Sequence, residues 1–418
     1  MSRSHLRAFL LVITLFSMCL SGIAQVPIGG GPGIRFLGYI TSTTGTVQCS
    51  DNTGNAITHQ QYAPYAPTPS PPSNVGPVAV IKGNSFTINA QFWVPGPFID
   101  GVITLNTVKF KGVPITASMP TYYVSSSTGF VQTCTIQVGP VPNYVDAGDI
   151  TVEIDTDELD TSWWPYGRVA GLAVTNFRLY VVYDQPTAPQ VKPWVGVLED
   201  ACLYARFQAT EANVAGESTR GVFYGGNTYG MSPRRFYYPA STAPKWIDGT
   251  DGKFKLTNYL ATSGWQEGNC RDVSTYLGIC TNALGLSYAT SILDYPPLGF
   301  DTNLLCAIGS DPLDYMSYGS FVGSTFYPGL PWGWDHHSVL VSGSLVFDAC
   351  AAQWATPGGS TYQNPPAGWT LSGSTSYWTS TSRNPLATPA TLAWFGTGLV
   401  SSPNPSTPSQ STPVFNVK

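Results

Sequence analysis

A cysteine in the segment Gly268–Asp272 has the sequence context of a nucleophile. Asn269 is a good N-cap residue, and Asp272 stands three residues later, where its carboxylate can face back to the cap. Apolar positions then follow at helical spacing, and the pattern ends at a glycine suited to a helix stop: Val273, Leu277, Cys280, Leu284 and Gly285. The pattern predicts a buried helix over 270–284 that begins at Cys270. A helix N-terminus favours a thiolate and lowers its pKa, as a nucleophilic thiol requires.

A base for this thiol must come from four histidines, of which His5 and His59 stand alone and His336 and His337 are adjacent. Residues 337–348 read as two short strands joined at Ser342-Gly343. If Val341 pairs with Ser344, His337 lies directly opposite Asp348, with Cβ atoms about 5 Å apart. His336 then points to the other face of the hairpin. This register predicts that Asp348 holds the imidazole of His337 in one tautomer and stabilises its charged form.

These features together resemble the transglutaminase-like branch of the papain-type cysteine-enzyme superfamily. The residues that carry the resemblance are Gly268-x-Cys270 at a helix start, Ala283-Leu284-Gly285-Leu286 at its end, and the later hairpin with histidine and aspartate. It covers about 265–350 closely and 190–375 loosely. The resemblance implies a triad in which Cys270 is the nucleophile, His337 the general base and then acid, and Asp348 the orienting group. Members of the family cleave, deamidate or cross-link amides through a thioester.

The resemblance leaves the oxyanion donor open. Papain-like enzymes use a glutamine shortly before the cysteine, for which Gln266 is the candidate, whereas transglutaminases use a tryptophan further upstream, for which Trp265 and Trp246 are candidates. The backbone N–H of Cys270 can supply one donor in either case. The chemistry implied requires no metal and no organic cofactor.

Composition indicates an exported β-rich protein. Charged residues make up 10% of the 418-residue chain, and its net charge is −5, against roughly 25% charged residues in an average soluble domain. The absence of a Lys/Arg cluster argues against nucleic acid or an anionic membrane surface as a partner. Residues 1–24 read as a signal peptide, with Arg3 and Arg7 before an apolar run and Gly22-Ile23-Ala24 at the cleavage site. That run is too short for a membrane span, so we expect a soluble extracellular or periplasmic protein.

The chain divides into two predicted domains. A flexible lead-in at 25–35 precedes residues 36–186, where alternating segments predict an all-β sandwich. After a Pro-rich linker, residues 190–375 predict an α+β domain of transglutaminase-like or papain-like type, with helices at 195–207, 253–261 and 270–284 and strands from Ser338 onward. Residues 376–418 form a C-terminal extension that we expect to be disordered from about 403.

Seven cysteines remain after the leader, an odd number in a compartment where disulfides are expected. Cys270 and Cys280 are about 15 Å apart along one helix, and a disulfide needs Cα atoms within about 7 Å. We therefore predict that Cys270 is the unpaired thiol and that Cys49 pairs with Cys134. The disulfide pairing among the other four cysteines stays unassigned: Cys202, Cys280, Cys306 and Cys350. An odd cysteine could instead link two chains, which predicts a dimer that a reducing agent splits.

The function predicted on this basis is that of a secreted cysteine hydrolase or acyltransferase acting on a protein or peptide substrate. The alternative is a catalytically inactive surface binding protein or adhesin with the same folds. The aromatic segment from Tyr315 to Trp334 suits either a groove wall beside His337 or packing over the core.

Overall fold

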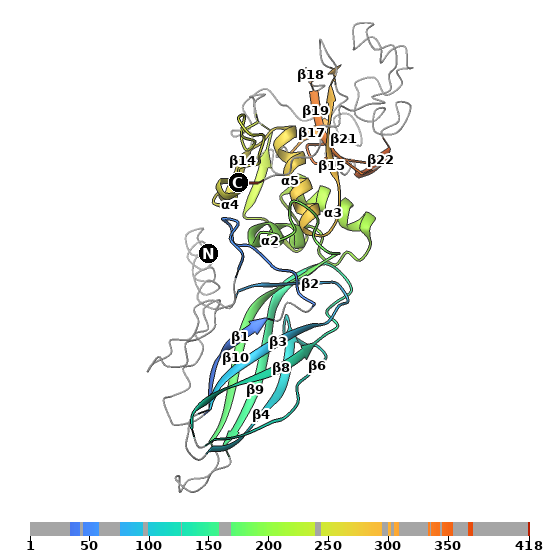
Figure 1. Ribbon diagram of the computed structural model, residues 1–418. Coiled ribbons are helices and arrows are strands. Elements are labelled where there is room, and N and C mark those ends of the chain that lie inside the picture. The colour runs from blue at the N-terminus through green and yellow to red at the C-terminus, as the bar shows by residue number, and fades with distance from the viewer. Residues whose placement is uncertain are drawn as a thin grey trace, which may run out of the picture.

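The computed structural model describes most of the chain between residues 34 and 308 and shorter segments beyond it (Figure 1). The described ranges are 34–41, 45–57, 76–94, 99–126, 128–158, 169–238, 244–294, 300–301, 305–308, 333–334, 336–342, 345–353, 367–370 and 417–418. The predicted signal peptide, almost all of the lead-in and most of the aromatic segment 315–334 lie outside them. None of the helices in these ranges has the length and apolar character needed to cross a membrane.

Two β-sheets form the first part of the chain. One has the strand order β1-β3-β8-β6, and the other has the order β2-β10-β9-β4-β5, with β7 also paired to β4. Their bounds are β1 Arg35–Thr41, β2 Val78–Ile81, β3 Phe86–Val94, β4 Ile99–Phe110, β5 Val113–Pro114, β6 Ala117–Ser118, β7 Tyr122–Ser126, β8 Phe130–Val138, β9 Asp146–Glu158 and β10 Val169–Val182. The predicted β-rich reading of this segment is confirmed.

The alternation seen in the sequence explains how these sheets pack. Along β3, Phe86, Ile88, Ala90, Phe92 and Val94 are buried, while most residues between them are less so. They share one apolar core with inward-facing residues of the other sheet, notably Ile150, Val152 and Ile154 of β9. A strand that is apolar at every second position buries one face, and two such faces make a sandwich core.

In the described part of the chain, four helices follow the sheets: α2 Val195–Tyr204, α3 Glu211–Tyr224, α4 Leu256–Leu260 and α5 Cys270–Ala283. The sequence predicted α2, α4 and α5 but not α3. The buried face of α3 includes Ala215, Ser218, Thr219 and Gly221, so its apolar periodicity is weak. The signals for this helix are its ends, since the Thr210 side chain accepts from the Asn213 N–H and Gly225 adopts the left-handed conformation.

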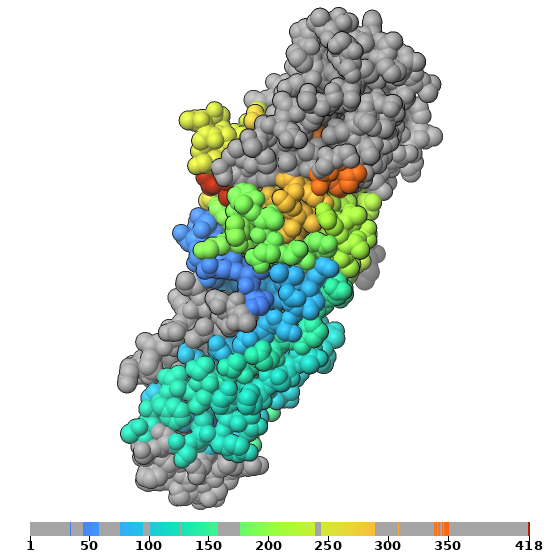
Figure 2. All heavy atoms as spheres, turned by 45° about the vertical axis from the view of Figure 1, so that its right-hand side comes forward, coloured from blue at the N-terminus to red at the C-terminus, as the bar shows by residue number. Residues whose placement is uncertain are grey.

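Short strands complete the second part. They are β11 Gly226–Asn227, β12 Gly230–Met231, β13 Arg234–Tyr237, β14 Gly264–Glu267, β15 Ala289–Asp294, β16 Phe300–Asp301, β17 Leu305–Ala307, β18 Gly333–Trp334, β19 His336–Ser342, β20 Leu345–Phe347, β21 Ala351–Gln353 and β22 Ala367–Thr370. A four-stranded sheet has the order β15-β19-β20-β22, and α5 packs against β19 and β15. In Figure 2 the helices lie between the sandwich strands and this later part of the chain.

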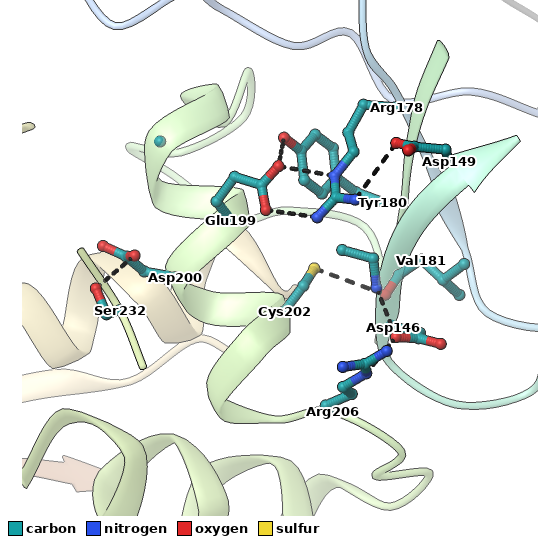
Figure 3. Close-up of polar contacts among 12 residues, drawn as sticks. Asp146, Asp149, Arg178, Tyr180, Val181, Glu199, Asp200, Cys202, Arg206 and Ser232 are labelled. Carbon is teal, nitrogen blue, oxygen red and sulfur yellow. Dashed lines mark hydrogen bonds and ion pairs between the residues drawn. The ribbon is translucent and has the colours of Figure 1, made fainter. Parts of the chain in front are cut away.

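Helix α2 joins the two parts through ion pairs with the sandwich strands β9 and β10 (Figure 3). The Arg178 guanidinium of β10 donates two hydrogen bonds of 2.7 Å to the Glu199 carboxylate of α2, and the Tyr180 hydroxyl donates to the same carboxylate at 2.8 Å. Just after α2, Arg206 donates to Asp146 of β9 at 2.9 Å. A bidentate guanidinium–carboxylate pair fixes geometry as well as charge, so the helix layer is oriented on the end of the sandwich.

The predicted Cys49–Cys134 disulfide is wrong. All six cysteines whose side chains the structure describes are free: Cys49, Cys134, Cys202, Cys270, Cys280 and Cys350. Cys134 lies in the sandwich core, whereas Cys49 belongs to the core beneath the helices. Burial raises the pKa of both thiols to about 12, so they remain neutral and apolar in character. The prediction rested on how few cysteines the segment holds, which carries no information about distance.

The last two residues also depart from the expected disorder of the tail. Val417 forms a parallel bridge with Phe254, and the Lys418 backbone N–H donates to the Phe254 carbonyl at 3.0 Å. The Lys418 ammonium group lies 2.8 Å from an Asp248 carboxylate oxygen and 3.2 Å from one of Asp251. These contacts place the end of the chain beside α4.

Two glycines of α3 provide a matched test of this packing. A Cβ atom at Gly221 would lie 2.5 Å from the Tyr204 Cβ of α2, whereas one at Gly216 would meet nothing within 4 Å. We expect Gly221→Ala to destabilise the protein by about 1–3 kcal/mol through overpacking. Gly216→Ala should stabilise it by about 0.5–1 kcal/mol through helix propensity. Urea unfolding of both variants measures the difference, and equal shifts would contradict this helix contact.

Candidate active site

Cys270 is the first residue of α5, as the sequence predicted. The Asn269 side chain accepts hydrogen bonds from the backbone N–H groups of Arg271 and Asp272, at 3.0 and 3.1 Å. In return the Asp272 carboxylate accepts from the Asn269 N–H at 3.2 Å, which completes the capping box. The cap therefore holds Cys270 at the end of the helix where its free N–H groups concentrate positive potential.

The Asp272 carboxylate also holds the chain segment that runs beside the helix start. It accepts hydrogen bonds from three successive backbone N–H groups, those of Lys245 at 2.9 Å, Trp246 at 2.9 Å and Ile247 at 3.1 Å. Burial raises the pKa of Asp272, and these backbone donors act in the opposite direction. One buried side chain thus fixes both the end of α5 and the 245–247 segment.

Tyr238 lies directly against the thiol. Its hydroxyl is hydrogen-bonded to both the side chain and the backbone of Cys270, and burial raises the pKa of this tyrosine well above its usual value. Tyr238 therefore lies at the start of α5, next to the thiol.

A short run of backbone hydrogen bonds connects this point to Asp348. The Tyr238 N–H donates to the Ile308 carbonyl at 3.1 Å, and the Ile308 N–H donates to the Cys350 carbonyl at 2.7 Å. The Cys350 N–H in turn donates to the Asp348 carboxylate at 2.8 Å. Asp348 is 1% exposed. The carboxylate of Asp348 is thus buried, and these hydrogen bonds connect it to the segment that contains Tyr238.

The histidine-bearing strand packs against the same helix. The Ser274 hydroxyl of α5 lies 2.7 Å from the Ser338 hydroxyl of β19. Ser274 is one turn after Cys270, and Ser338 follows His337 directly. The start of β19 therefore lies beside the start of α5. The side chains of His336 and His337 themselves lie outside the part of the chain that the structure describes.

The predicted register of the hairpin is wrong by two residues. Val341 pairs with Val346, Leu340 with Phe347 and Ser342 with Leu345, in place of the expected pairing of Val341 with Ser344. Strand β20 ends at Phe347, which places Asp348 just beyond the ladder and not in a pair with His337. The error arose because a shift of two residues preserves the faces of a strand, and the hydrophobic pattern therefore could not exclude it.

Strand alternation adds a constraint on the choice between the two histidines. Positions 336, 338 and 340 share one face of β19 because successive residues alternate. Ser338 contacts α5, and Leu340 belongs to the same core as α5. Position 336 is thus on the helix-facing side of β19, and position 337 is on the other. The sequence selected His337 through the register now corrected, so its role remains a proposal.

The three oxyanion candidates take part in other contacts. The Trp246 indole N–H donates to the Glu267 carbonyl at 2.7 Å, and the Gln266 amide donates to the Ser263 carbonyl at 2.9 Å. The Trp265 ring lies under the Arg235 guanidinium, 4.9 Å from its centre. The hydrogen bonds of Trp246 and Gln266 hold local backbone. The Cys270 backbone N–H, by contrast, lies next to the thiol because both groups belong to the same residue.

A buried ionic network supports the helix one turn further along. Asp200 of α2 pairs with Arg234 of β13 at 3.0 Å, and accepts hydrogen bonds from Ser232 at 2.8 Å and from the Tyr276 hydroxyl of α5. Arg234 also donates to the carbonyls of Gly196 and Leu260, both at 3.3 Å. Sequence reasoning missed this network and Tyr238, because their members are scattered over 77 positions from Asp200 to Tyr276 with no local motif.

Comparisons with known proteins assign no family. No protein-family model matches the chain, and no curated protein matches it. Among solved structures, the ASH/PapD-like domain 7 of human CEP192 is 15% identical over 30% of this chain and 94% of its own, with a TM-score of 0.18. The CooA pilin subunit from enterotoxigenic Escherichia coli is 13% identical over 36% of this chain and 99% of its own, with a TM-score of 0.18. Red sea bream transglutaminase is 11% identical over 65% of this chain and 49% of its own, with a TM-score of 0.30. These TM-scores are too low to assign a fold.

Replacing Asp272 tests the polar support of the site. In Asp272→Asn the amide group turns donors toward backbone N–H groups that need acceptors, so buried donors lose their partners. We expect the free energy of unfolding to fall by about 3 kcal/mol. Asp251→Asn is the control, because Asp251 is exposed and its ion pair with Lys418 lies at the surface, where such pairs contribute little to stability. Denaturant unfolding measures both, and equal stabilities would contradict the assigned role.

Proposed function

We propose that the chain is a cysteine-dependent acyl-transfer enzyme with a transglutaminase-like α+β domain, and that Cys270 attacks a carboxamide or peptide carbonyl. The observation that carries this proposal is the 2.7 Å contact between the Ser274 and Ser338 hydroxyls. That contact brings the start of a helix that opens with a cysteine beside the start of a strand that opens with two histidines. A nucleophile and a base must meet in this way for covalent catalysis.

The reaction has two steps. The Cys270 sulfur bonds to the carbonyl carbon, the carbon–nitrogen bond breaks, and a histidine passes the thiol proton to the nitrogen, which leaves as ammonia or an amine. Water or a second amine then adds to the thioester carbon, the carbon–sulfur bond breaks, and the histidine returns the nucleophile's proton to sulfur. The Cys270 backbone N–H stabilises the oxyanion in both steps. Protein groups suffice for each transfer.

The base in this proposal belongs to the His336–His337 pair, and Asp348 is its orienting carboxylate. The sequence favours His337 as the base, and strand alternation favours position 336. Both residues lie at the start of β19, one or two positions before the strand's contact with α5 at Ser338. Asp348 is buried in the same layer. Substitution of each histidine separately decides between them.

The proposal extends to the whole chain. The sandwich over 36–186 serves as a spacer or a binding module, and residues 1–24 direct export to an extracellular or periplasmic location. The substrate is a protein or peptide that presents a carboxamide. No feature of the described residues requires nucleic acid as a partner.

Thiol alkylation tests the nucleophile without knowledge of the substrate. We expect iodoacetamide to modify Cys270 of the native protein at least tenfold faster than Cys280, which lies in the same helix. Burial raises the pKa of Cys280 well above its usual value, so that thiol stays protonated near neutral pH. Peptide mapping by mass spectrometry gives both rates. Equal rates, or modification of Cys280 first, would count against a nucleophilic role.

The histidine variants extend the same assay. Alanine at the catalytic position should slow alkylation of Cys270 at neutral pH by about tenfold or more, because the thiolate loses its base. Alanine at the other position of the His336–His337 pair is the matched control and should have a small effect. If neither substitution changes the rate, the proposed cysteine–histidine pair does not exist.

Amide turnover tests the reaction itself. With a glutamine-containing protein and a fluorescent primary amine, we expect release of ammonia by water or incorporation of the amine. Cys270→Ala should abolish both products, since no thioester can form. Cys134→Ala, in the sandwich core, is the control that should keep the activity. Turnover by Cys270→Ala at the wild-type rate would refute the mechanism.

A further inference from the structure

A pocket lies among α2, α3 and the β11–β12 hairpin. It has a volume of about 620 Å³, within the range typical of small-molecule sites. Residues from the end of α2, from the exposed side of α3 and from the hairpin line it, and Trp265 of β14 contributes to its wall. None of these residues has a part in the acyl transfer proposed above, except that Trp265 was one of three candidate oxyanion donors.

An arginine and two aromatic rings pack together at one side of this pocket. Tyr229 of the hairpin is 53% exposed, and its ring meets that of Phe207 edge to face at a centroid distance of 4.8 Å. The Arg206 guanidinium lies over both rings, 5.0 Å from Phe207 and 5.3 Å from Tyr229. Asp146 fixes the other side of Arg206 (Figure 3). The rings thus present an apolar surface next to a cation that is already held in place.

The charge around the pocket is positive although the whole chain carries −5. Arg206 and Arg220 line it, and Glu217 is the one acid among the described lining residues. Asp146 is shared between Arg206 and Lys111, which leaves one of those two cations without an equivalent anion. A carboxylate entering the pocket would therefore meet a local excess of positive charge.

The Arg220 guanidinium is open to a ligand in the pocket. Arg220 uses Nη1 to donate to Glu217 at 2.6 Å, and its side chain is still 40% exposed. The Asn227 amide, in contrast, is already bonded to the carbonyls of Leu203 and Tyr204. A bound carboxylate can therefore form a charge-assisted hydrogen bond with the exposed part of Arg220.

We infer that this pocket binds a carboxylate attached to an apolar or aromatic body, with Arg220 and Arg206 holding the carboxylate and Tyr229 packing on the body. Two sources share this chemistry, the C-terminal residue of a peptide and a free aromatic acid. The site is separate from Cys270, so its occupancy does not depend on the acyl-transfer proposal.

Calorimetric titration of the full-length protein with three probes tests the inference. We expect N-acetylphenylalanine to bind and its uncharged C-terminal amide to bind at least tenfold more weakly, because only the acid offers a charged acceptor. 3-Phenylpropionate, which lacks the peptide group, distinguishes the sources: comparable binding indicates a free acid, and weaker binding indicates a peptide terminus. Equal binding of the acid and its amide, or no binding of either acid at millimolar concentrations, would overturn the inference.

Variants on α3 provide the second arm. Arg220→Gln should weaken binding of the acid about tenfold or more, and Glu217→Gln should strengthen it because Arg220 loses its competing partner. Lys192→Gln removes an exposed cation outside the pocket and should leave the affinity unchanged. Cys270→Ala should also bind normally, which separates this result from any failure of the enzyme proposal. An unchanged affinity in both α3 variants would contradict the assigned role of Arg220.

Discussion

The architecture around the site depends on how the N-terminus of a buried helix is satisfied. Helix α5 is buried at every position except Arg271. The first N–H groups of a helix have no partner within it, and water cannot reach them when the helix is enclosed. Asn269 and Asp272 provide the acceptors, and the spare capacity of the Asp272 carboxylate goes to the 245–247 backbone. Because that requirement falls at Cys270, the thiol is held at the most positive point of the helix.

The same helix organises the layers on either side of it. Tyr276 reaches the Asp200–Arg234 pair, which ties α5 to α2 and β13, and Ser274 reaches β19 on its other side. Through α2 the arrangement continues to the sandwich, where Glu199 holds Arg178. A buried ion pair contributes little net stability by itself, but removal of one partner leaves a charge without compensation. The network therefore restricts how α2, α5 and β13 can be placed relative to one another.

The features that depend only on neighbouring residues could be predicted from the sequence. The Asn269–Asp272 capping box and the start of α5 follow from neighbouring residues, and the alternation in β3 follows from its own sequence. Helix α3 was missed because small and polar residues form its buried face, and the hairpin register was misjudged because a two-residue shift keeps the same faces inward. Tyr238 meets the site through a chain crossing that no spacing in the sequence records, whereas Asp348 was selected from a hairpin pairing that the structure does not contain.

The central claim is that Cys270 forms a covalent acyl intermediate. The most direct measurement is the intact mass of the protein after brief exposure to an activated ester, followed by peptide mapping. The account predicts one acyl group, located on Cys270, removed by hydroxylamine and absent from Cys270→Ser under the same conditions. An acyl group on another residue, or no acylation of the wild-type protein while a small free thiol reacts readily, would contradict it.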